Sequence, residues 1–491
     1  MNKHVIIVGT GLGGLATAMR LATAGYTVEM IEKNPQAGGR LNQLKKDGFT
    51  FDMGPTFFSM SYEFKEFAQA CGIEMPFRFI ELDPLYTVNF GGSDRKFVIY
   101  KDLKKLAAEF EGIEDNFEEK IRVYLKKAGA IFHDTEHAIV KRNFSGWFDF
   151  ASVIKDVPIK HTPMLFRSIW TELGHHFDSY EAKVIFSLIA FFLGDTPFAT
   201  PAVYTLLNYT ELVHDGYYNV EGGMYRIVEG LLPELEKKGV KIHYNTEINK
   251  IEDKNGKVVS VTDTKGQNYK ADIFVINADA SAFRGLMLNR PQFSVKKLDA
   301  MKWTIAPFTM YLGIDQKVPN IGHHNYFLGR NFKEYAGTVL EKFDVNEKAY
   351  YYVNVPSKHN PSTAPEGCES IFILCPVPDL RFRPDWSDRE ALADNIISDL
   401  GERIGFDLHK HIVSRTVLDP ADWEKMFGLY RGSGLGLAHN MSQIGYFRPH
   451  NKDEVFPNLY YVGASTIPGT GLPMVIVGSK LTTERIIEDH S

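Results

Sequence analysis

The sequence is poor in cysteine and in long apolar stretches. Its three cysteines, Cys71, Cys368 and Cys375, are too few for a disulfide framework and lack the spacing of a four-ligand zinc site. They are expected to be free thiols, which favours a reducing compartment. The longest apolar stretch, residues 184–194, is about half of the ~20 residues that a helix needs to cross a bilayer. A disulfide scaffold, a zinc site and a membrane-spanning protein are therefore not expected.

Net charge is also small. The chain has 55 Lys+Arg against 61 Asp+Glu, a formal net charge of −6, so no basic field is available to bind nucleic acid. The first residues, MNKHVIIVGTG, lack the pattern of a secretory signal. These features predict a cytoplasmic protein, soluble or peripherally attached to a membrane. With 491 residues it has room for two to four domains or one large interleaved architecture.

One residue class is abundant. The chain has 35 Phe, 23 Tyr and 5 Trp, which together make 13% of its residues. Several of these aromatics, including Phe186, Phe191, Phe192 and Phe198, lie at helical spacing in an apolar region. Such a pattern most often belongs to a core, but it would also line a cavity for a long apolar ligand.

The first forty residues form a βαβ unit. Residues 5–8 are a continuous apolar run, typical of a parallel strand that is buried on both faces. Gly9, Gly11 and Gly14 follow as GxGxxG, and apolar residues then recur at helical spacing up to Gly25. A second strand over residues 26–31 ends at Glu32.

This unit predicts a dinucleotide site. The first glycine allows a tight turn, the second lets the backbone approach a pyrophosphate, and the third lets helix and strand pack closely. The helix N-terminus offers N–H groups to the phosphates. Glu32 lies 18 residues after Gly14, where a carboxylate binds both ribose hydroxyls and disfavours the 2′-phosphate of NADP.

The residues that follow favour FAD over NAD. Gly38-Gly39-Arg40 and Asp52-Met53-Gly54-Pro55-Thr56 come shortly after the ribose acid. A permanently bound flavin must be held along its whole length, whereas NAD needs no second glycine pair. The alternative is a simple turn with a surface ion pair at Arg40.

The remaining strands are far apart in the chain. Residues 239–244, 258–262, 271–276 and 459–462 are predicted strands, and residues 474–488 a closing helix. The fold class is therefore α/β with α+β: a discontinuous Rossmann-type FAD-binding domain with an inserted substrate domain of mixed sheet and helices. The expected division is FAD-binding over residues 1–84, 215–290 and 421–491, a helical, membrane-facing substrate region over 85–214, and a substrate-binding domain over 291–420.

Further motifs extend along nearly the whole chain. They are Gly194-Asp195-Thr196-Pro197-Phe198, Glu221-Gly222-Gly223-Met224, Asn277-Ala278-Asp279, Tyr430-Arg431-Gly432-Ser433, Phe447-Arg448-Pro449, LYYVGAST over 459–466 and PGTGLP over 468–473. Together with the N-terminal motifs they resemble the bacterial-type carotenoid (phytoene) desaturases of the flavin amine-oxidase-like superfamily. The order and spacing of the C-terminal motifs are the most specific part of this resemblance.

The resemblance implies a set of residues that bind FAD. They are Gly9, Gly11, Leu12, Gly13, Gly14, Glu32, Lys33, Gly39, Arg40, Gly54, Pro55, Thr56, Ile248, Asn277, Gly463, Ala464, Gly471, Leu472 and Met474. No metal is implied. The sequence departs from the family at Ile467, where many members have His, and at Thr470, where many have Gly or Ala. Because Ile467 cannot exchange protons, a general base at that position is in doubt. The Pro473-Met474 ending is closer to the hydroxycarotenoid 3,4-desaturases.

The implied reaction is desaturation of a carotenoid, CH–CH becoming CH=CH, by hydride transfer to flavin and loss of a proton. No catalytic residue is assigned. Asp195 and Glu211 are expected to have structural roles, and His323 and His324 are expected in a surface loop or, alternatively, at a pocket mouth. Oxygen and a quinone both stay open as the final electron acceptor.

Three other hypotheses share the scaffold: a phytoene-type desaturase that acts earlier, a flavin amine oxidase, and a prenyl-lipid carrier without flavin, like the Rab GDP-dissociation inhibitors. The intact Glu32 and Gly38-Gly39-Arg40 argue against the carrier. A carotenoid substrate implies contact with a membrane surface, for which residues 158–170, with mixed basic and apolar side chains, are a candidate. A core helix with a solvated basic edge is the alternative for that segment.

Overall fold

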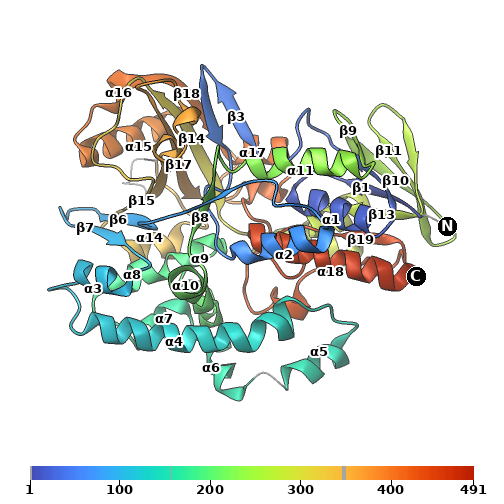
Figure 1. Cartoon of the computed structure of the whole chain (residues 1–491), viewed down its shortest axis with the longest axis horizontal. Coiled ribbons are helices and arrows are strands. Elements are labelled where there is room, and N and C mark those ends of the chain that lie inside the picture. The colour runs from blue at the N-terminus through green and yellow to red at the C-terminus, as the bar shows by residue number, and fades with distance from the viewer. Residues whose placement is uncertain (1–2, 156–157, 346–349) are drawn as a thin grey trace.

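A computed structural model describes residues 3–155, 158–345 and 350–491. Three parts are visible in Figure 1: a parallel sheet with its helices, a seven-stranded sheet beside it, and a layer of helices beneath both. The two chain ends lie together at the edge of the first part. The part of the chain that is described contains no helix with both the length and the hydropathy of a membrane span.

The parallel sheet is the predicted nucleotide-binding core. Its strand order is β19-β13-β1-β2-β9, and every neighbouring pair is parallel. The bounds are β1 His4–Val8, β2 Thr27–Ile31, β9 Lys241–His243, β13 Ile273–Ile276 and β19 Leu459–Tyr461. Strands from three distant stretches of chain therefore form one sheet, as the sequence predicts for a discontinuous domain. All four residues of β13 are buried, as expected of a central parallel strand.

Helices cover this sheet. They are α1 Leu12–Thr23, α2 Ser61–Cys71, α11 Arg226–Lys237 and α18 Leu472–His490. The first and last of them, α1 and α18, pack against each other although they stand at opposite ends of the chain. A small antiparallel sheet of β10 Ile248–Lys254, β11 Lys257–Asp263 and β12 Asn268–Lys270 extends beyond, with a tight turn at Asn255-Gly256 between its first two strands.

The seven-stranded sheet has the order β18-β14-β17-β16-β15-β6-β7 and is antiparallel except between β15 and β6. The bounds are β6 Tyr86–Phe90, β7 Lys96–Ile99, β14 Ala306–Ile314, β15 His324–Leu328, β16 Tyr351–Asn354, β17 Glu369–Val377 and β18 Ile412–Leu418. Side chains alternate between its faces: Phe308 and Met310 pack with α15 (Arg389–Ile404), whereas Tyr311 and Phe372 join the core shared with the helical layer.

The start of the region 85–214 differs from the prediction. It was expected to be helical, but residues 86–90 form β6 and residues 96–99 form β7, the edge strand of the seven-stranded sheet. Phe97 and Ile99 are buried and alternate with more exposed neighbours, which is a strand pattern. The predicted domain boundaries themselves stay predictions.

The rest of that region is helical. Its helices are α3 Leu103–Glu109, α4 Phe117–Thr135, α5 Trp147–Ile154, α6 Thr162–Phe166, α7 Ile169–Leu173, α8 Tyr180–Ser187, α9 Ile189–Phe192 and α10 Leu206–Tyr209. Their apolar faces form one core with the seven-stranded sheet, in which the rings of Phe110 and Phe117 stack at 4.0 Å.

The remaining elements are short or peripheral. The strands are β3 Gln43–Lys46, β4 Phe49–Asp52, β5 Phe79–Glu81 and β8 Tyr218–Val220, and the helices are α12 Ala280–Ala282, α13 Val295–Ala300, α14 Phe332–Thr338, α16 Leu408–His411 and α17 Pro420–Phe427. All three cysteines are free thiols, as predicted: Cys71 and Cys375 are buried and Cys368 is half-buried.

Candidate active site

A cavity of about 1140 Å³ lies where the three parts meet. Its lining includes the glycine-rich loop after β1, the end of β2, the segment 53–60, the end of β13 and the start of α18. The helical layer and the seven-stranded sheet supply the rest of the wall. Segments from both ends of the chain therefore close around one space.

The glycine-rich loop packs against Asn277. A Cβ atom at Gly9 would lie 2.6 Å from the Asn277 carbonyl oxygen, and one at Gly11 would lie 2.8 Å from its Nδ2. Nδ2 also donates a hydrogen bond of 3.3 Å to the Gly9 carbonyl oxygen. The loop and the end of β13 thus fit together only when these positions carry no side chain.

Gly14 has the packing role that its place in the motif predicts. A Cβ atom there would lie 2.3 Å from the Gly9 carbonyl oxygen, well inside contact distance. Its absence lets α1 approach β1, with the N-terminus of α1 toward the cavity. Gly11, the N-cap of α1, has no side chain to satisfy the first N–H groups of the helix. These groups are free to bind an anion.

Glu32 is held in place by its own loop. Its carboxylate accepts hydrogen bonds from Thr10 N at 2.9 Å, Thr10 Oγ1 at 2.6 Å and Asn34 N at 2.9 Å, and the residue is buried. These donors orient the carboxylate at the carboxyl end of β2, where it lines the cavity. A carboxylate at this position has lone pairs left for the hydroxyl groups of a ribose.

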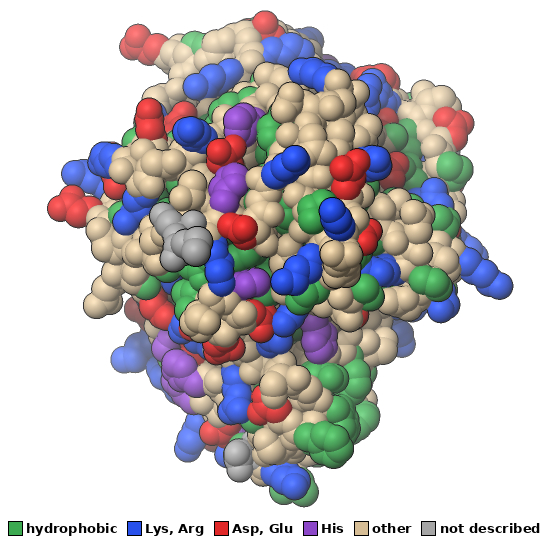
Figure 2. Space-filling model, turned by 90° about the vertical axis from the view of Figure 1, so that its right-hand side faces the viewer, with side chains coloured by type: hydrophobic (Ala, Val, Ile, Leu, Met, Phe, Trp, Pro, Cys, Tyr) green, Lys and Arg blue, Asp and Glu red, His purple; other side chains and the backbone are tan. Residues whose placement is uncertain are grey.

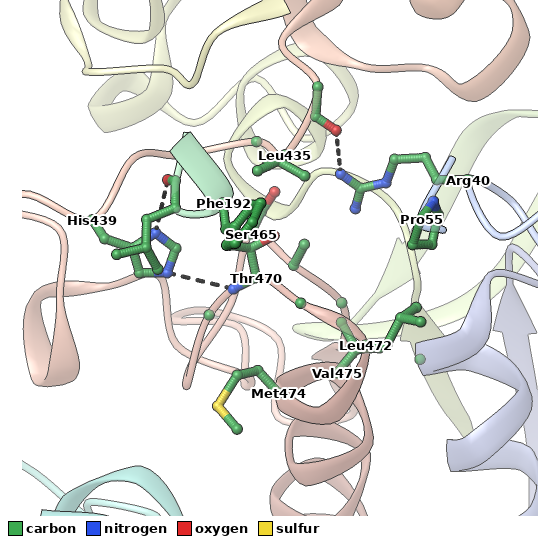
Figure 3. Close-up of a pocket in the computed structure, with 18 of the residues that line it drawn as sticks. Arg40, Pro55, Phe192, Leu435, His439, Ser465, Thr470, Leu472, Met474 and Val475 are labelled. Carbon is green, nitrogen blue, oxygen red and sulfur yellow. Dashed lines mark hydrogen bonds between the residues drawn. The ribbon is translucent and has the colours of Figure 1, made fainter. Parts of the chain in front are cut away.

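Arg40 lines the cavity and connects two distant segments of its wall. Its Nη1 donates a 2.7 Å hydrogen bond to the Gly434 carbonyl oxygen (Figure 3). Burial lowers the pKa of Arg40 and raises the pKa of Asp279, and the opposite charge of each residue counteracts the shift in the other. Asp279 also accepts a hydrogen bond from Ser465 Oγ at 2.8 Å and caps α12. The interpretation of Arg40 as a surface ion pair is therefore wrong, because the side chain is half-buried, lines the cavity and is hydrogen-bonded to Gly434.

A proline-glycine loop, residues 468–473, forms the floor of the cavity and leads into α18 (Figure 3). Arg448 supports this part of the chain: it is fully buried and donates hydrogen bonds to five backbone carbonyl oxygens, including those of Ala464 and Thr466. Burial lowers its pKa to about 10, so it stays charged at neutral pH.

His439 lies beside the same loop. Its Nε2 accepts a long hydrogen bond of 3.4 Å from Thr470 N, and its ring is buried against Tyr204. Burial, and then the charge of Arg448, lower the pKa of His439 well below the ordinary value, so the ring is neutral. Sequence reasoning assigned no role to His439 or Arg448. The Phe447-Arg448-Pro449 motif was the only signal for the arginine.

All of the predicted FAD-binding residues except Gly14 line this one cavity. Their contacts with FAD stay predictions, but the fold brings together residues from both ends of the chain as a single FAD site requires. Ile467, the departure from the family, is buried and lines the cavity with an apolar side chain.

The remainder of the cavity is apolar. Phe191 and Phe192 line it, as the sequence predicts for part of the aromatic group, together with Tyr217, Tyr326 and Tyr352. Phe186 lies in the core instead, and Phe198 packs against Trp170 with ring centroids 4.9 Å apart. Some of the aromatic residues therefore line the cavity, and others pack in the core.

Asp195 and Glu211, the acidic residues considered as a possible base, are both buried but have different surroundings. Asp195 is buried and accepts a 2.7 Å hydrogen bond from Thr196 N, a structural role as predicted. Glu211 is buried behind the cavity wall, where it accepts hydrogen bonds from Tyr217 Oη and, at 2.8 Å, from Asn208 Nδ2. Burial raises the pKa of Glu211 to about 7.

His323 and His324 are not surface residues. Both are buried, and His324 is the first residue of β15, in the seven-stranded sheet. The prediction of a surface loop after Pro319 is wrong because residues 324–328 pair on both sides, with β16 and with β6.

The residues in the cavity fit FAD. The crowded glycine loop leaves backbone N–H groups free at the start of α1, and α18 likewise begins at Gly471 without a side-chain cap. Two helix N-termini and the half-buried guanidinium of Arg40 offer N–H donors to a pyrophosphate, and the fixed carboxylate of Glu32 offers an acceptor to the hydroxyl groups of a ribose.

Comparison with known proteins gives the class first. Residues 12–487 match the model of the flavin-containing amine oxidoreductases, so the chain belongs to that family. It is an FAD-dependent oxidoreductase with a flavin amine oxidase-like fold.

Within this family the chain is similar to carotenoid desaturases. It is 34% identical to the zeta-carotene-forming phytoene desaturase of Myxococcus xanthus, over 99% of this chain and 94% of that protein. It is 32% identical to the 4,4'-diapophytoene desaturase (4,4'-diaponeurosporene-forming) of Staphylococcus aureus, over 99% of both chains. Among solved structures, an oxidoreductase from Methanosarcina mazei shares the fold with a TM-score of 0.65 and 18% identity, covering 98% of this chain and 100% of that one. These relatives confirm the family that the sequence motifs indicated.

Proposed function

We propose that the protein desaturates a carotenoid with FAD as its oxidant. The observation that carries this proposal is a single cavity in which a dinucleotide site opens into an aromatic and apolar chamber. The names of the relatives, which act on phytoene and diapophytoene, support the same substrate class. The finer proposal is 3,4-desaturation of an acyclic or hydroxylated carotenoid, which the Pro473-Met474 sequence supports.

The cofactor-site residues divide into three groups by the part of FAD that they would hold. The glycine loop and the start of α1 would hold the pyrophosphate, Glu32 would hold the ribose, and Arg40 with the segments 463–464 and 471–474 would hold the flavin end. FAD, when bound, supplies the two-electron oxidation that side chains cannot perform. The protein aligns the polyene and excludes water, and the substrate cation is stabilised by its own conjugation.

We also propose that the substrate enters from a membrane surface. Three side chains of the helical layer stand out into solvent: Phe148 is 89% exposed, Ile159 88% and Phe166 79%. Hydrophobic side chains gather at the lower end of the molecule in Figure 2, the end that carries α5 and α6 in Figure 1. Trp147, Ile154 and Phe447, also exposed, line the cavity.

This arrangement links the patch to the cavity. The Trp147 ring contacts Tyr446 and Phe447, so α5 and the segment 441–447 border the same opening. Lys160 is exposed beside the apolar residues and would favour anionic headgroups. We place the protein at the cytoplasmic face of a membrane, which its three free thiols support.

The test uses FAD-loaded protein and carotenoids in liposomes, under anaerobic conditions. Bleaching of the flavin band together with a shift of the polyene spectrum to longer wavelength is expected. The proposal of 3,4-desaturation is tested by supplying phytoene, lycopene and hydroxylated carotenoids separately and analysing the product of each. Bleaching by amines, with no carotenoid converted, would contradict the proposal in favour of an amine oxidase.

A further inference from the structure

Five aromatic rings that line the cavity form one connected group. Phe57 is at its centre: its ring centroid is 4.6 Å from that of Tyr217, 5.5 Å from that of Phe192 and 6.2 Å from that of Tyr352. The Tyr352 ring lies in turn 5.2 Å from the ring of Tyr326. We call these five residues, Phe57, Phe192, Tyr217, Tyr326 and Tyr352, the Phe57 cluster.

The Phe57 cluster lies where the FAD site meets the apolar chamber. Phe57 directly follows Gly54-Pro55-Thr56, a segment that is predicted to bind FAD. Phe192 is the last residue of α9 in the helical layer, and Figure 3 shows it among the cavity residues together with Thr470 and Leu472 of the proline-glycine loop. A carbon that gives up its hydrogen to FAD must lie beside FAD, and it therefore also lies near these rings.

The residues of the cluster present mainly ring surface to a ligand. Tyr217 Oη donates a hydrogen bond to the carboxylate of Glu211, which is buried behind the cavity wall. Tyr352 Oη is hydrogen-bonded to Thr56 Oγ1 at 2.7 Å. The two phenylalanines carry no polar side-chain atom, and both are half-buried in the lining of the cavity.

These rings are not covered by a cationic side chain of the described residues. In residues 3–155, 158–345 and 350–491, each Lys or Arg that lies over an aromatic face uses a ring outside the cluster. His324 packs on Phe57 with ring centroids 4.8 Å apart, but burial lowers its pKa well below the ordinary value, so this ring is neutral. The face of an aromatic ring is electron-rich and attracts a cation, most strongly where water is excluded.

We propose that the Phe57 cluster stabilises the cation that forms on the carotenoid during desaturation, with Phe57 as a catalytic residue. The inference rests on the proposed function. One C–H bond of the substrate breaks first, and its hydrogen leaves with both electrons to FAD, so that a positive charge remains on the polyene. The neighbouring C–H bond then breaks, its electron pair becomes the new C=C bond, and its proton passes to solvent. Conjugation spreads the charge between the two steps, and the rings that face it lower its energy further.

Aromatic rings suit this role better than the alternatives. Aliphatic side chains would bind the neutral polyene as well as rings do, but they would not bind the cation more tightly than the substrate, and catalysis depends on that difference. An ionised carboxylate would attract the cation, but it would be costly to bury in an apolar chamber and could form an ester with the cationic carbon. The rings attract the charge without forming a bond to it.

The test places phenylalanines with one, two and three fluorine atoms at position 57. Fluorine withdraws electron density from the ring face and changes the shape of the ring little. In anaerobic single-turnover mixing with a carotenoid in liposomes, flavin bleaching should slow with each added fluorine, to about 10-fold slower at three. The same series at Phe64 is the matched control, because Phe64 is buried in α2 outside the cavity lining. This control series should show no trend.

Equal FAD content and equal melting temperatures first establish that all variants are folded. A bleaching rate that does not change with the number of fluorine atoms at position 57, or a trend of equal size at position 64, would overturn the inference and leave the proposed function intact. Failure of every carotenoid to bleach the wild-type flavin would instead contradict the proposed function.

A binding measurement decides on the cluster without turnover. Geranyltrimethylammonium carries a permanent positive charge and has no lone pair for an amine oxidase to attack, and its neutral counterpart has carbon in place of nitrogen. Three fluorine atoms at position 57 should weaken binding of the ammonium compound about 10-fold, measured by the change in flavin absorbance, and leave binding of the neutral compound unchanged. An equal effect on both compounds would overturn the inference whatever the result with carotenoids.

Discussion

Glu32 is one residue on which cofactor binding depends. Three donors, two from Thr10 and one from Asn34, aim its carboxylate at the cavity. In Glu32→Ala we expect FAD binding to weaken about 10- to 100-fold, because a charge-assisted hydrogen bond is worth roughly 1.5–3 kcal/mol. Fluorescence titration of the apoprotein with FAD measures this. Glu29→Ala, in β2 but outside the cavity, should bind FAD normally, and equal affinity in both variants would contradict the role of Glu32.

Glu211 should make stability depend on pH. Burial raises its pKa in the folded protein to about 7, against roughly 4.3 in the unfolded chain. Between these values the folded state holds a proton that the unfolded state has released. The free energy of unfolding therefore falls as pH rises through this window, by roughly 4 kcal/mol in total.

Glu211→Gln removes this titration. The melting temperature of the variant minus that of the wild type should increase by a few degrees between pH 5 and pH 8, because only the wild type loses stability over this range. Parallel melting curves of the apoproteins at several pH values measure the difference. A difference that stays constant over the window would show that Glu211 is already ionised in the folded protein.

At the scale of elements, the contact between α1 and β1 depends on Gly14. The Cβ atom of Gly14→Ala would meet the Gly9 carbonyl oxygen at 2.3 Å, so the helix must move and its N-terminus leaves the pyrophosphate position. We expect loss of bound FAD and a lower melting temperature. The control is Gly337→Ala in α14, where a Cβ meets nothing within 4 Å. Retention of FAD by Gly14→Ala, at the level of this control, would contradict the packing argument.

Elements whose pattern is local were predictable. The strand at Val5, the glycine loop and Glu32 fall within forty residues and each has a chemical reason for its spacing. What depends on distant partners was not predictable. His324 is buried because β15 pairs with β6 and β16, and no feature near Pro319 shows that pairing. Arg448 and His439 acquire their roles only when the loops around Leu437 and Ala464 come together.

At the scale of the whole molecule, the exposed patch of Phe148 in α5, Ile159 in the turn before α6 and Phe166 in α6 should control membrane binding. The double variant Phe148→Ser, Ile159→Ser removes two side chains that would each contribute roughly 1.5–3 kcal/mol when buried in lipid. We expect binding to anionic liposomes, measured by sedimentation, to fall about 100-fold or more. Leu286→Ser with Val413→Ser, also exposed but in other elements, is the matched control. Equal loss in both double variants would contradict a specific membrane face.

The order of strands in the parallel sheet has a consequence for synthesis. β1 lies between β2 and β13, β19 completes the edge beside β13, and α18 packs on α1. The glycine loop therefore leaves the ribosome long before the strand and helix that enclose it. Because contacts between distant segments form late, the nascent chain must keep its first βαβ unit incomplete until residues 459–490 have emerged. FAD therefore binds only after the C-terminal segment has been synthesised. A nascent chain on a ribosome stalled before β19 would be unable to bind FAD.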